Sequence, residues 1–233
     1  MIATIAAIRS LSPRVKEFVL QLPQTVSFSA GQFVVMTINV GVDQIQRSYS
    51  IANDSAGETD QLVLWIALNE SGRVTPQLFQ MVEGAQLDVS EPQGGFVLRD
   101  ASLQQVVVFV CTGTGVAPFR SMIHQCLQQQ DGSPVVLVMG NRHREDVLGH
   151  TEWLQLAEST PRFHYLPVLS RPNEADVDMQ SGYVHAYYRD WVIKNPQAHV
   201  YVCGWDAMCK EARQQLKDLG LTRRQYFFEQ YDG

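Results

Sequence analysis

Four residues near the start of the chain, Arg47-Ser48-Tyr49-Ser50, combine a cation, a phenol and two hydroxyl groups at the end of a strand-like run. Arginine suits a phosphate because its planar fork donates two parallel hydrogen bonds. Tyrosine offers a flat apolar face with a polar tip, and a serine hydroxyl can donate to a ring nitrogen. Taken alone, the four residues also fit an ordinary polar strand end.

A second candidate is the turn Thr112-Gly113-Thr114-Gly115, which lies between a buried strand-like run and a helical run with Pro118 in its first turn. Glycines let a bulky anion approach the backbone, and the free amides and dipole of a helix N-terminus favour a phosphate. The turn lacks the third glycine of the G-x-G-x-x-G pattern, and a purely structural role is the alternative. Its position between strand and helix favours phosphate binding.

The segments that must position these residues change character near residue 100. Before it, six short β-type runs with turn residues between them predict an antiparallel barrel or sandwich. One helix is expected at residues 74–82, with Thr75 as N-cap and Pro76 at its first position. The expected strands are residues 3–11, 15–23, 32–40, 47–53, 61–68 and 86–92.

The second half alternates strand-like and helical runs, which predicts a parallel, doubly wound α/β sheet. The expected strands are residues 105–112, 134–140, 163–170 and 199–204, and the expected helices are residues 117–130, 151–159, 185–194 and 206–220. We therefore predict one domain at residues 1–100 and a second at residues 101–233, with a linker at residues 98–104.

Composition excludes several classes of function. The net charge of −6 argues against nonspecific nucleic-acid binding. No apolar run approaches the roughly 18 residues of a membrane span, so a cytoplasmic protein without a membrane partner is expected. The histidines lack metal-ligand spacing, and the cysteines lack C-x-x-C or iron–sulfur spacing, so no metal site and free thiols are expected. The cysteines are Cys111, Cys126, Cys203 and Cys209.

Taken in order, these segments and four others resemble the ferredoxin–NADP⁺ reductase superfamily of flavin-dependent pyridine nucleotide reductases. The resemblance covers nearly the whole chain and implies a six-stranded antiparallel β-barrel that binds flavin, followed by an α/β domain that binds a nicotinamide nucleotide. The motifs are RSYS at 47–50, SGRVTPQL at 71–78, EPQGGFVL at 91–98, TGTGVAP at 112–118, VCGWDAM at 202–208 and YFFEQYDG at 226–233.

By this resemblance, the first two motifs bind the flavin. Arg47 would hold a flavin phosphate, Tyr49 would pack on the isoalloxazine ring, and Ser50 would lie near N5, the atom that receives hydride. The pyrophosphate would lie against Gly72, Arg73, Val74 and Thr75. FAD is favoured over FMN because most relatives with both motifs hold FAD. The third motif departs from the family pattern at Glu91, which replaces a glycine, and no ligand contact is expected there.

The fourth and fifth motifs would bind the nicotinamide nucleotide. Thr112 would lie close to the nicotinamide, and the pyrophosphate would lie against Gly113, Thr114 and Gly115. Cys203 would sit beside nicotinamide C4, where Gly204 leaves room for the ring; a buried core thiol is the alternative for this cysteine. Trp205 replaces the usual proline.

The C-terminal motif would complete the site. Glu229 would relay a proton or orient the nicotinamide, and Tyr231 or Phe228 would cover the flavin. The residues expected to act in hydride transfer are Ser50, Cys203 and Glu229.

Nucleotide selection is expected at the ends of two later strands, which carry Arg142, Arg144, Ser170 and Arg171. A 2′-phosphate is recognised by arginines and a hydroxyl, whereas a bare 2′-hydroxyl is recognised by an acidic acceptor. We therefore expect NADPH to be preferred over NADH. The alternative is that these arginines are solvated or pair with Glu145, Asp146 or Glu174.

The resemblance implies a reductase that passes hydride from NAD(P)H to bound flavin, and then electrons to a separate redox protein such as a ferredoxin, a flavodoxin or an oxygenase component. One alternative is a reductase that treats free flavin or ferric iron as its substrate. Another is a regulatory subunit that keeps both folds without turnover, which the intact RSYS and C-G motifs disfavour.

Overall fold

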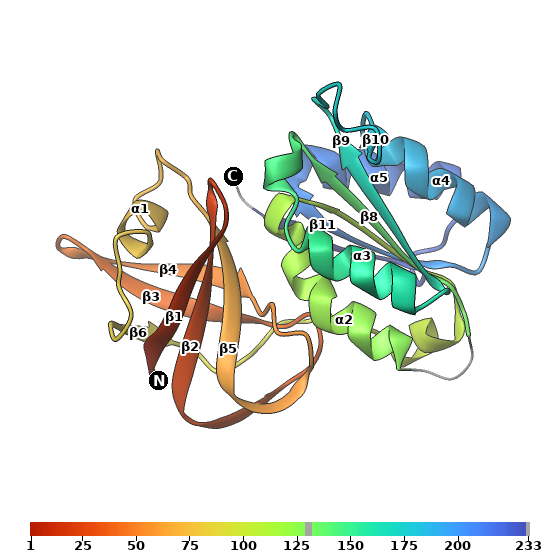
Figure 1. Cartoon of the computed structure of the whole chain (residues 1–233). Helices are drawn as coiled ribbons and strands as arrows, with labels where there is room; N and C mark the ends of the chain where they lie inside the picture. The colour runs from red at the N-terminus through yellow and green to blue at the C-terminus, as the bar shows by residue number, and fades with distance from the viewer. Residues whose placement is uncertain (129–131, 232–233) are drawn as a thin grey trace. The chain divides into compact units, whose positions relative to one another are not determined.

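The computed structural model describes residues 1–128 and 132–231, and the chain forms two compact units (Figure 1). The first, here called the barrel unit, comprises Met1–Leu98 with Ala117–Gln125. The second, the sheet unit, comprises Arg99–Val116 with Cys126–Gly233. The predicted domain division at residue 100 stays a prediction.

The barrel unit is built on six antiparallel strands, in agreement with the sequence. They are β1 (Ile2–Ser12), β2 (Val15–Phe28), β3 (Phe33–Val40), β4 (Asp43–Ser50), β5 (Gly57–Ala67) and β6 (Gln86–Val89). Their order is β4-β3-β6-β1-β2-β5, and an antiparallel bridge between Ile51 and Leu64 joins the two edge strands. The sheet thereby closes around a core of side chains such as Phe18, Leu20 and Met36.

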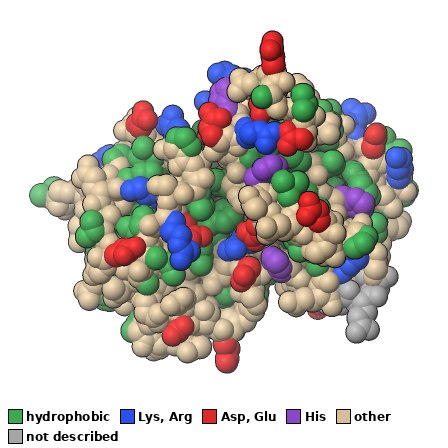
Figure 2. Space-filling view, viewed as in Figure 1, with side chains coloured by type: hydrophobic (Ala, Val, Ile, Leu, Met, Phe, Trp, Pro, Cys, Tyr) green, Lys and Arg blue, Asp and Glu red, His purple; other side chains and the backbone are tan. Residues whose placement is uncertain are grey.

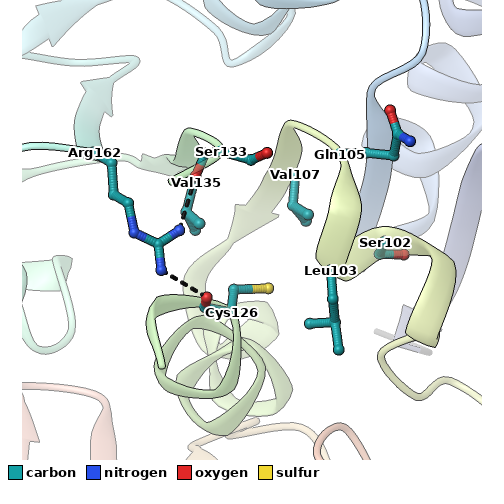
Figure 3. A pocket seen from close by; sticks show the side chains of 8 residues that line it. All are labelled: Ser102, Leu103, Gln105, Val107, Cys126, Ser133, Val135 and Arg162. Atoms are coloured by element: carbon teal, nitrogen blue, oxygen red, sulfur yellow. Dashed lines mark hydrogen bonds between the residues drawn. The ribbon is translucent and has the colours of Figure 1, made fainter. Parts of the chain in front are cut away.

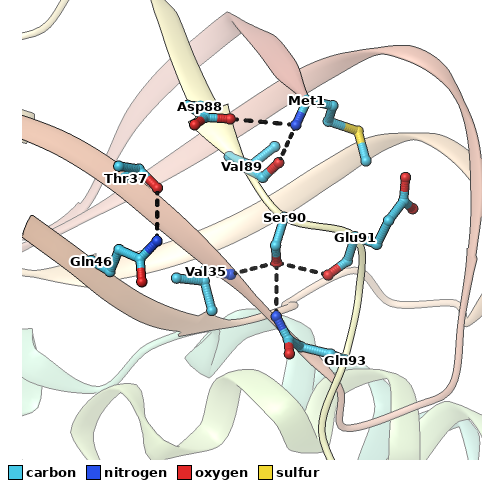
Figure 4. A network of polar contacts seen from close by, with 9 residues as sticks. All are labelled: Met1, Val35, Thr37, Gln46, Asp88, Val89, Ser90, Glu91 and Gln93. Atoms are coloured by element: carbon cyan, nitrogen blue, oxygen red, sulfur yellow. Dashed lines mark hydrogen bonds and ion pairs between the residues drawn. The ribbon is translucent and has the colours of Figure 1, made fainter.

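The segment that follows β6 is tied to β3 by the hydroxyl of Ser90 (Figure 4). Ser90 Oγ accepts the Val35 N–H at 2.9 Å and the Gln93 amide at 3.1 Å, and donates to the Glu91 carbonyl at 2.7 Å. Gln93 then exchanges two backbone hydrogen bonds with Phe33. The segment after β6 therefore continues the pairing of β6 with β3 as far as Phe33, the first residue of β3.

Two details of the barrel unit correct the sequence expectations. Helix α1 is a single turn, Thr75–Leu78, and Val74 occupies the N-cap position predicted for Thr75. The Thr75 hydroxyl is used elsewhere: it accepts the Asn69 N–H at 2.8 Å and donates to the Asn69 carbonyl at 3.1 Å, which closes the preceding loop. The strand expected at residues 47–53 begins earlier, because β4 forms a hairpin with β3 through Gly41.

The sheet unit has six parallel strands in the order β10-β9-β8-β7-β11-β12, which confirms the doubly wound α/β fold. The strands are β7 (Val107–Thr112), β8 (Val135–Asn141), β9 (Phe163–Leu169), β10 (Gln180–Ser181), β11 (His199–Trp205) and β12 (Tyr226–Tyr231). The chain order reverses between β7 and β11. In such sheets ligands bind outside the carboxyl ends of the strands at this reversal.

Helices cover the two faces of this sheet (Figure 1). The helices are α3 (His150–Ser159), α4 (His185–Lys194) and α5 (Asp206–Asp218), with short 3₁₀ turns at Asp100–Gln104, Gly113–Val116 and Arg144–Asp146. Helices α4 and α5 share one hydrophobic core with β7, β8 and β11, while α3 packs on the opposite face. Helix α2 (Ala117–Leu127) belongs mainly to the barrel unit, and residues 129–130 of its expected range lie outside the described residues.

The expected linker is anchored on the sheet unit by a buried serine. Ser102 is fully buried, and its hydroxyl lies 2.7 Å from His199 Nδ1 and 2.8 Å from the Tyr201 hydroxyl. The Arg99 N–H also donates to that hydroxyl, at 2.9 Å. The linker therefore packs on the amino-terminal half of β11, away from the carboxyl ends of the strands.

The charged surface and the state of the cysteines can be compared with what the composition predicted. Acidic and basic side chains are interspersed on the face shown in Figure 2. All four cysteines are buried free thiols, as expected. Within the described part of the chain, no helix combines the length and the apolar character that a membrane crossing requires.

We expect Ser90→Ala to lower the free energy of unfolding by about 1–3 kcal/mol, because the partly buried Val35 N–H loses its side-chain acceptor. Chemical denaturation of the purified protein measures this change. Ser55→Ala is the matched control, since Ser55 is exposed and makes only a 3.4 Å contact with the neighbouring carbonyl. Equal stabilities of the two variants would contradict the role of Ser90.

Candidate functional site

Strand β4 places two of its three expected ligand residues on one face. Arg47 pairs with Met36 and Tyr49 with Val34 across the β3–β4 ladder, so their side chains share the face of those core residues. Arg47 is exposed and donates to the Gln46 carbonyl at 2.8 Å. Ser50 falls on the other face by strand alternation and is only 8% exposed.

Burial reinforces the neutral state of the phenol on this strand. Tyr49 packs against the barrel core, and burial raises its pKa to about 12, although the neighbouring Arg47 works in the opposite direction. The phenol is therefore neutral at physiological pH. It presents an uncharged ring beside a solvent-exposed cation, a combination that suits a ligand with an aromatic part and an anionic part.

The loop before α1 adds a second cation and several free amides. Arg73 Nη2 lies 2.5 Å from Asp43 Oδ2 at the start of β4, and both side chains are more than half exposed. An exposed ion pair of this kind is worth about 0–1 kcal/mol, so a phosphate can displace it. Among the described residues, no hydrogen bond uses the backbone N–H of Arg73, Val74 or Thr75. This donor set fits the pyrophosphate of a dinucleotide.

In the sheet unit, the loops after β7 and β11 meet backbone to backbone. A Cβ atom on Gly115 would overlap the Cys203 carbonyl, and one on Gly204 would overlap the Thr112 hydroxyl. The Trp205 N–H donates to that same hydroxyl at 3.2 Å. The approach of the two loops therefore requires Gly115 and Gly204, whatever they do for a ligand.

The turn between β7 and α2 leaves one glycine facing open space. Gly113 has a φ of +53°, and a Cβ atom built on it would have no neighbour within 4 Å. Gly113 is therefore the member of this turn with room for a ligand, and Thr114 follows it in the same 3₁₀ turn. The turn lies at the carboxyl end of β7, where parallel sheets bind ligands, and its pyrophosphate role stays a prediction.

Cys203 and Glu229 are brought together by the pairing of β11 with β12. They are register partners, and Cys203 Sγ lies 4.0 Å from Glu229 Oε2. Burial and then the Glu229 carboxylate raise the pKa of the Cys203 thiol well above its usual value, so it stays protonated. Such a neutral thiol next to a carboxylate can donate and pack but is a poor nucleophile.

The aromatic residues of β12 separate into two environments. Tyr231, the last described residue, pairs with Trp205 at the carboxyl end of β11. Phe228 instead packs against the core shared with α5, where the Arg213 guanidinium lies 4.7 Å from its ring. The Phe228 ring therefore packs inside the sheet unit. Of the two residues predicted to cover a flavin, Tyr231 remains the candidate.

Arg142, Ser170 and Arg171 lie together at the carboxyl ends of β8 and β9. The Ser170 N–H donates to the Asn141 carbonyl and the Arg171 N–H to the Arg142 carbonyl, each at 3.0 Å. Arg142 and Arg171 are exposed, and within the described residues neither forms a salt bridge. The two cations and the hydroxyl therefore form an open site for a phosphate.

Arg144 is not part of this open site. Its Nε lies 2.7 Å from Asp176 Oδ1, and its Nη2 contacts Asp178. The alternative that Arg144 pairs with a carboxylate therefore holds, but its partners are Asp176 and Asp178 and not Glu145, Asp146 or Glu174. The Arg144 guanidinium lowers the pKa of both carboxyl groups, which keeps them charged.

Asn141 is a candidate that sequence reasoning missed. It ends β8, and its buried side-chain Nδ2 has no hydrogen-bond partner among the described residues. A buried amide without a partner costs free energy unless a water or ligand satisfies it. Its position at the carboxyl end of a predicted parallel strand was the available signal.

A surface pocket at the amino ends of β7 and β8 does not form part of this site (Figure 3). The Arg162 guanidinium in its wall donates to the Ser133 and Cys126 carbonyls at 2.8 and 2.9 Å. The pocket has room for about one water molecule. It is too small for a nucleotide.

Comparison with known proteins identifies both halves of the chain. Residues 3–98 match the family described as oxidoreductase FAD-binding domain, and residues 109–214 match the oxidoreductase NAD-binding domain. Ferredoxin–NADP reductase B of Sorangium cellulosum is 31% identical over 99% of this chain and 97% of its own length. The phenol hydroxylase P5 protein of Acinetobacter pittii is 32% identical over 98% of this chain, which spans 65% of that relative.

The fold is also found in a solved structure. The ferredoxin–NADP⁺ reductase of Neisseria gonorrhoeae, crystallised with bound FAD and NADP, superposes with a TM-score of 0.82. The match covers 99% of this chain and 98% of that protein, at 23% identity. At this identity the likeness supports the fold alone.

We expect Gly204→Ala to destabilise the sheet unit by about 1–3 kcal/mol more than Gly182→Ala. Both glycines have positive φ, +142° and +113°, but only the Cβ at Gly204 would meet other atoms. Thermal unfolding of the two variants measures the difference. Equal destabilisation would show that backbone conformation alone, and not the contact with Thr112, requires glycine at residue 204.

Proposed function

The chain belongs to the ferredoxin–NADP reductase family, and we propose that it carries electrons from NADPH through bound FAD to a separate acceptor protein. The observation that carries this proposal is the presence, in one chain, of two donor-rich sites. One lies on β4 and the loop before α1, and the other at the carboxyl ends of β7, β8, β9 and β11. Bound FAD accepts hydride from a nicotinamide and releases electrons singly, which a nicotinamide does not do.

The barrel unit holds the flavin in this proposal. The Arg47 guanidinium and the backbone amides of residues 73–75 bind its phosphates, with Arg73 exchanging Asp43 for a phosphate oxygen. Tyr49 packs its neutral ring on the isoalloxazine. Ser50 would act at the N5 edge through its main chain. Its side chain lies on the face of β4 opposite to the Tyr49 ring.

The sheet unit holds the nicotinamide nucleotide. Gly113 and Thr114 approach the pyrophosphate, and Thr112, held by the Trp205 N–H, lines the nicotinamide site. The Cys203 thiol packs beside the reacting carbon without attacking it, because it remains protonated. Glu229 is the group that holds or moves a proton, since its carboxylate lies at the Cys203 thiol.

NADPH is the proposed electron donor because the open site at Arg142, Ser170 and Arg171 has two cations, neither of which forms a salt bridge in the part of the chain that the structure describes. The Sorangium relative is named a ferredoxin–NADP reductase, and the Acinetobacter relative is named a phenol hydroxylase protein. These names support a ferredoxin or an oxygenase component as the acceptor. A transient redox encounter of this type buries little surface. The cytoplasmic location stays a prediction.

We expect Arg47→Ala to weaken FAD retention about tenfold to hundredfold, because a hydrogen bond to a charged group contributes about 1.5–3 kcal/mol. Flavin absorbance per protein after gel filtration measures retention. Arg14→Ala is the matched control, since Arg14 is an exposed arginine of the same unit that pairs only with exposed Glu70 at 3.6 Å. Unchanged flavin content in the Arg47 variant would refute its phosphate role. A colourless wild type that reduces added flavin would instead indicate a free-flavin reductase.

We expect kcat/KM to be higher for NADPH than for NADH, and Arg171→Ala to lower the NADPH value about tenfold or more while leaving NADH unchanged. The reason is that only NADPH carries the phosphate that the Arg171 guanidinium would bind. Steady-state kinetics with both nucleotides measures the ratio. A wild-type preference for NADH would contradict the NADPH proposal.

A further inference from the structure

The segment that carries Arg171 has very little core of its own. Between Arg171 and Gln180, in the segment that leads from β9 to β10, only Asp176 and Met179 are buried. Their whole-residue exposures are 6% and 8%. Val177 is 90% exposed. A segment with so few buried apolar contacts depends on its polar anchors for a fixed conformation.

Asp176 is the main polar anchor of this segment. Its Oδ1 accepts from Arg144 Nε at 2.7 Å, and its Oδ2 accepts the Asn173 N–H at 2.8 Å. Backbone bonds from Asp176 N–H to the Asn173 carbonyl and from Met179 N–H to the Asp176 carbonyl continue the turn. One buried carboxylate thus joins the segment after β9 to the segment after β8.

The same two segments form the open phosphate site. Arg142 lies two residues before Arg144, and its carbonyl accepts the Arg171 N–H at 3.0 Å. The Arg144–Asp176 pair therefore acts on both sides of the site. It fixes the segments that present the Arg142 and Arg171 guanidinium groups and the Ser170 hydroxyl.

We propose that the Arg144–Asp176 pair positions Ser170 and Arg171 for the 2′-phosphate and so sets the discrimination between NADPH and NADH. This inference rests on the NADPH use proposed above. Arg144 acts through Arg142 and Arg171 and does not bind the phosphate itself, because its charge is already met by two carboxylates. Both are positioning residues.

Asp178 supplies the control for this inference. It contacts the same guanidinium, but its side chain is 55% exposed, whereas that of Asp176 is 4% exposed. Asp176→Asn and Asp178→Asn remove the same charge from the same place. They differ in whether the removed carboxylate holds the segment together.

The test compares steady-state kinetics of these two variants with NADPH and NADH. We expect Asp176→Asn to raise KM for NADPH about tenfold, as misplacement of a binding group does, with kcat and both NADH constants unchanged. Asp178→Asn should keep the wild-type ratio of the two nucleotides. If Asp176→Asn lowered the activity with NADPH and with NADH equally, its role would be merely structural and the inference would be overturned. The inference would also be overturned if Asp176→Asn and Asp178→Asn changed the NADPH kinetics equally.

A binding measurement keeps the inference testable if Asp176→Asn folds poorly. Arg144→Lys retains the charge but replaces the planar fork that bridges both carboxylates. We expect it to weaken inhibition by 2′-phospho-AMP about tenfold and to leave inhibition by AMP unchanged. Unchanged inhibition by both would overturn the inference. A wild type that prefers NADH would refute the proposed NADPH use itself, whereas a wild type that prefers NADPH with unaltered variants would refute only the positioning role.

Discussion

The contact between the loops after β7 and β11 is the constraint on which the candidate nucleotide site of the sheet unit depends. Gly115 and Gly204 are needed there because any side chain would overlap the Cys203 carbonyl or the Thr112 hydroxyl. This contact places Thr112, Cys203 and Trp205 at the reversal of strand order, where a parallel sheet offers its ligand crevice. The same packing buries the neutral Cys203 thiol and leaves Gly113, in the turn after β7, open to a ligand.

Each unit presents exposed cations that are available to phosphates and, in the same unit, a buried group that stays uncharged. In the barrel unit, Arg47 lies in solvent next to the neutral Tyr49 phenol. In the sheet unit, Arg142 and Arg171 lie in solvent, while the Cys203 thiol stays protonated. Exposed guanidinium groups remain available for phosphates, and the buried groups contribute shape without competing charge.

Much of this architecture was visible in the sequence. Short β-type runs separated by turn residues predicted the barrel strands, and strand-like runs that alternate with helical runs predicted the parallel sheet, because each signal is local. What was not visible depends on residues distant in the chain. Arg144 pairs with Asp176, Thr75 bonds to Asn69 instead of capping α1, and the Asn141 side-chain N–H group finds no hydrogen-bond partner among the described residues. The two-residue strand β10 is too short for any periodic pattern. The roles of the ligand residues stay predictions.

The central claim is that this one chain transfers electrons from a nicotinamide nucleotide to a flavin it retains. Anaerobic stopped-flow mixing of the purified, flavin-loaded protein with NADPH tests it without any acceptor. The absorbance is followed at the flavin maximum, about 450 nm. Rapid loss of the flavin absorbance within one turnover is the predicted result. A flavin spectrum that stays unchanged with both NADPH and NADH would contradict the claim and would favour a regulatory protein without turnover.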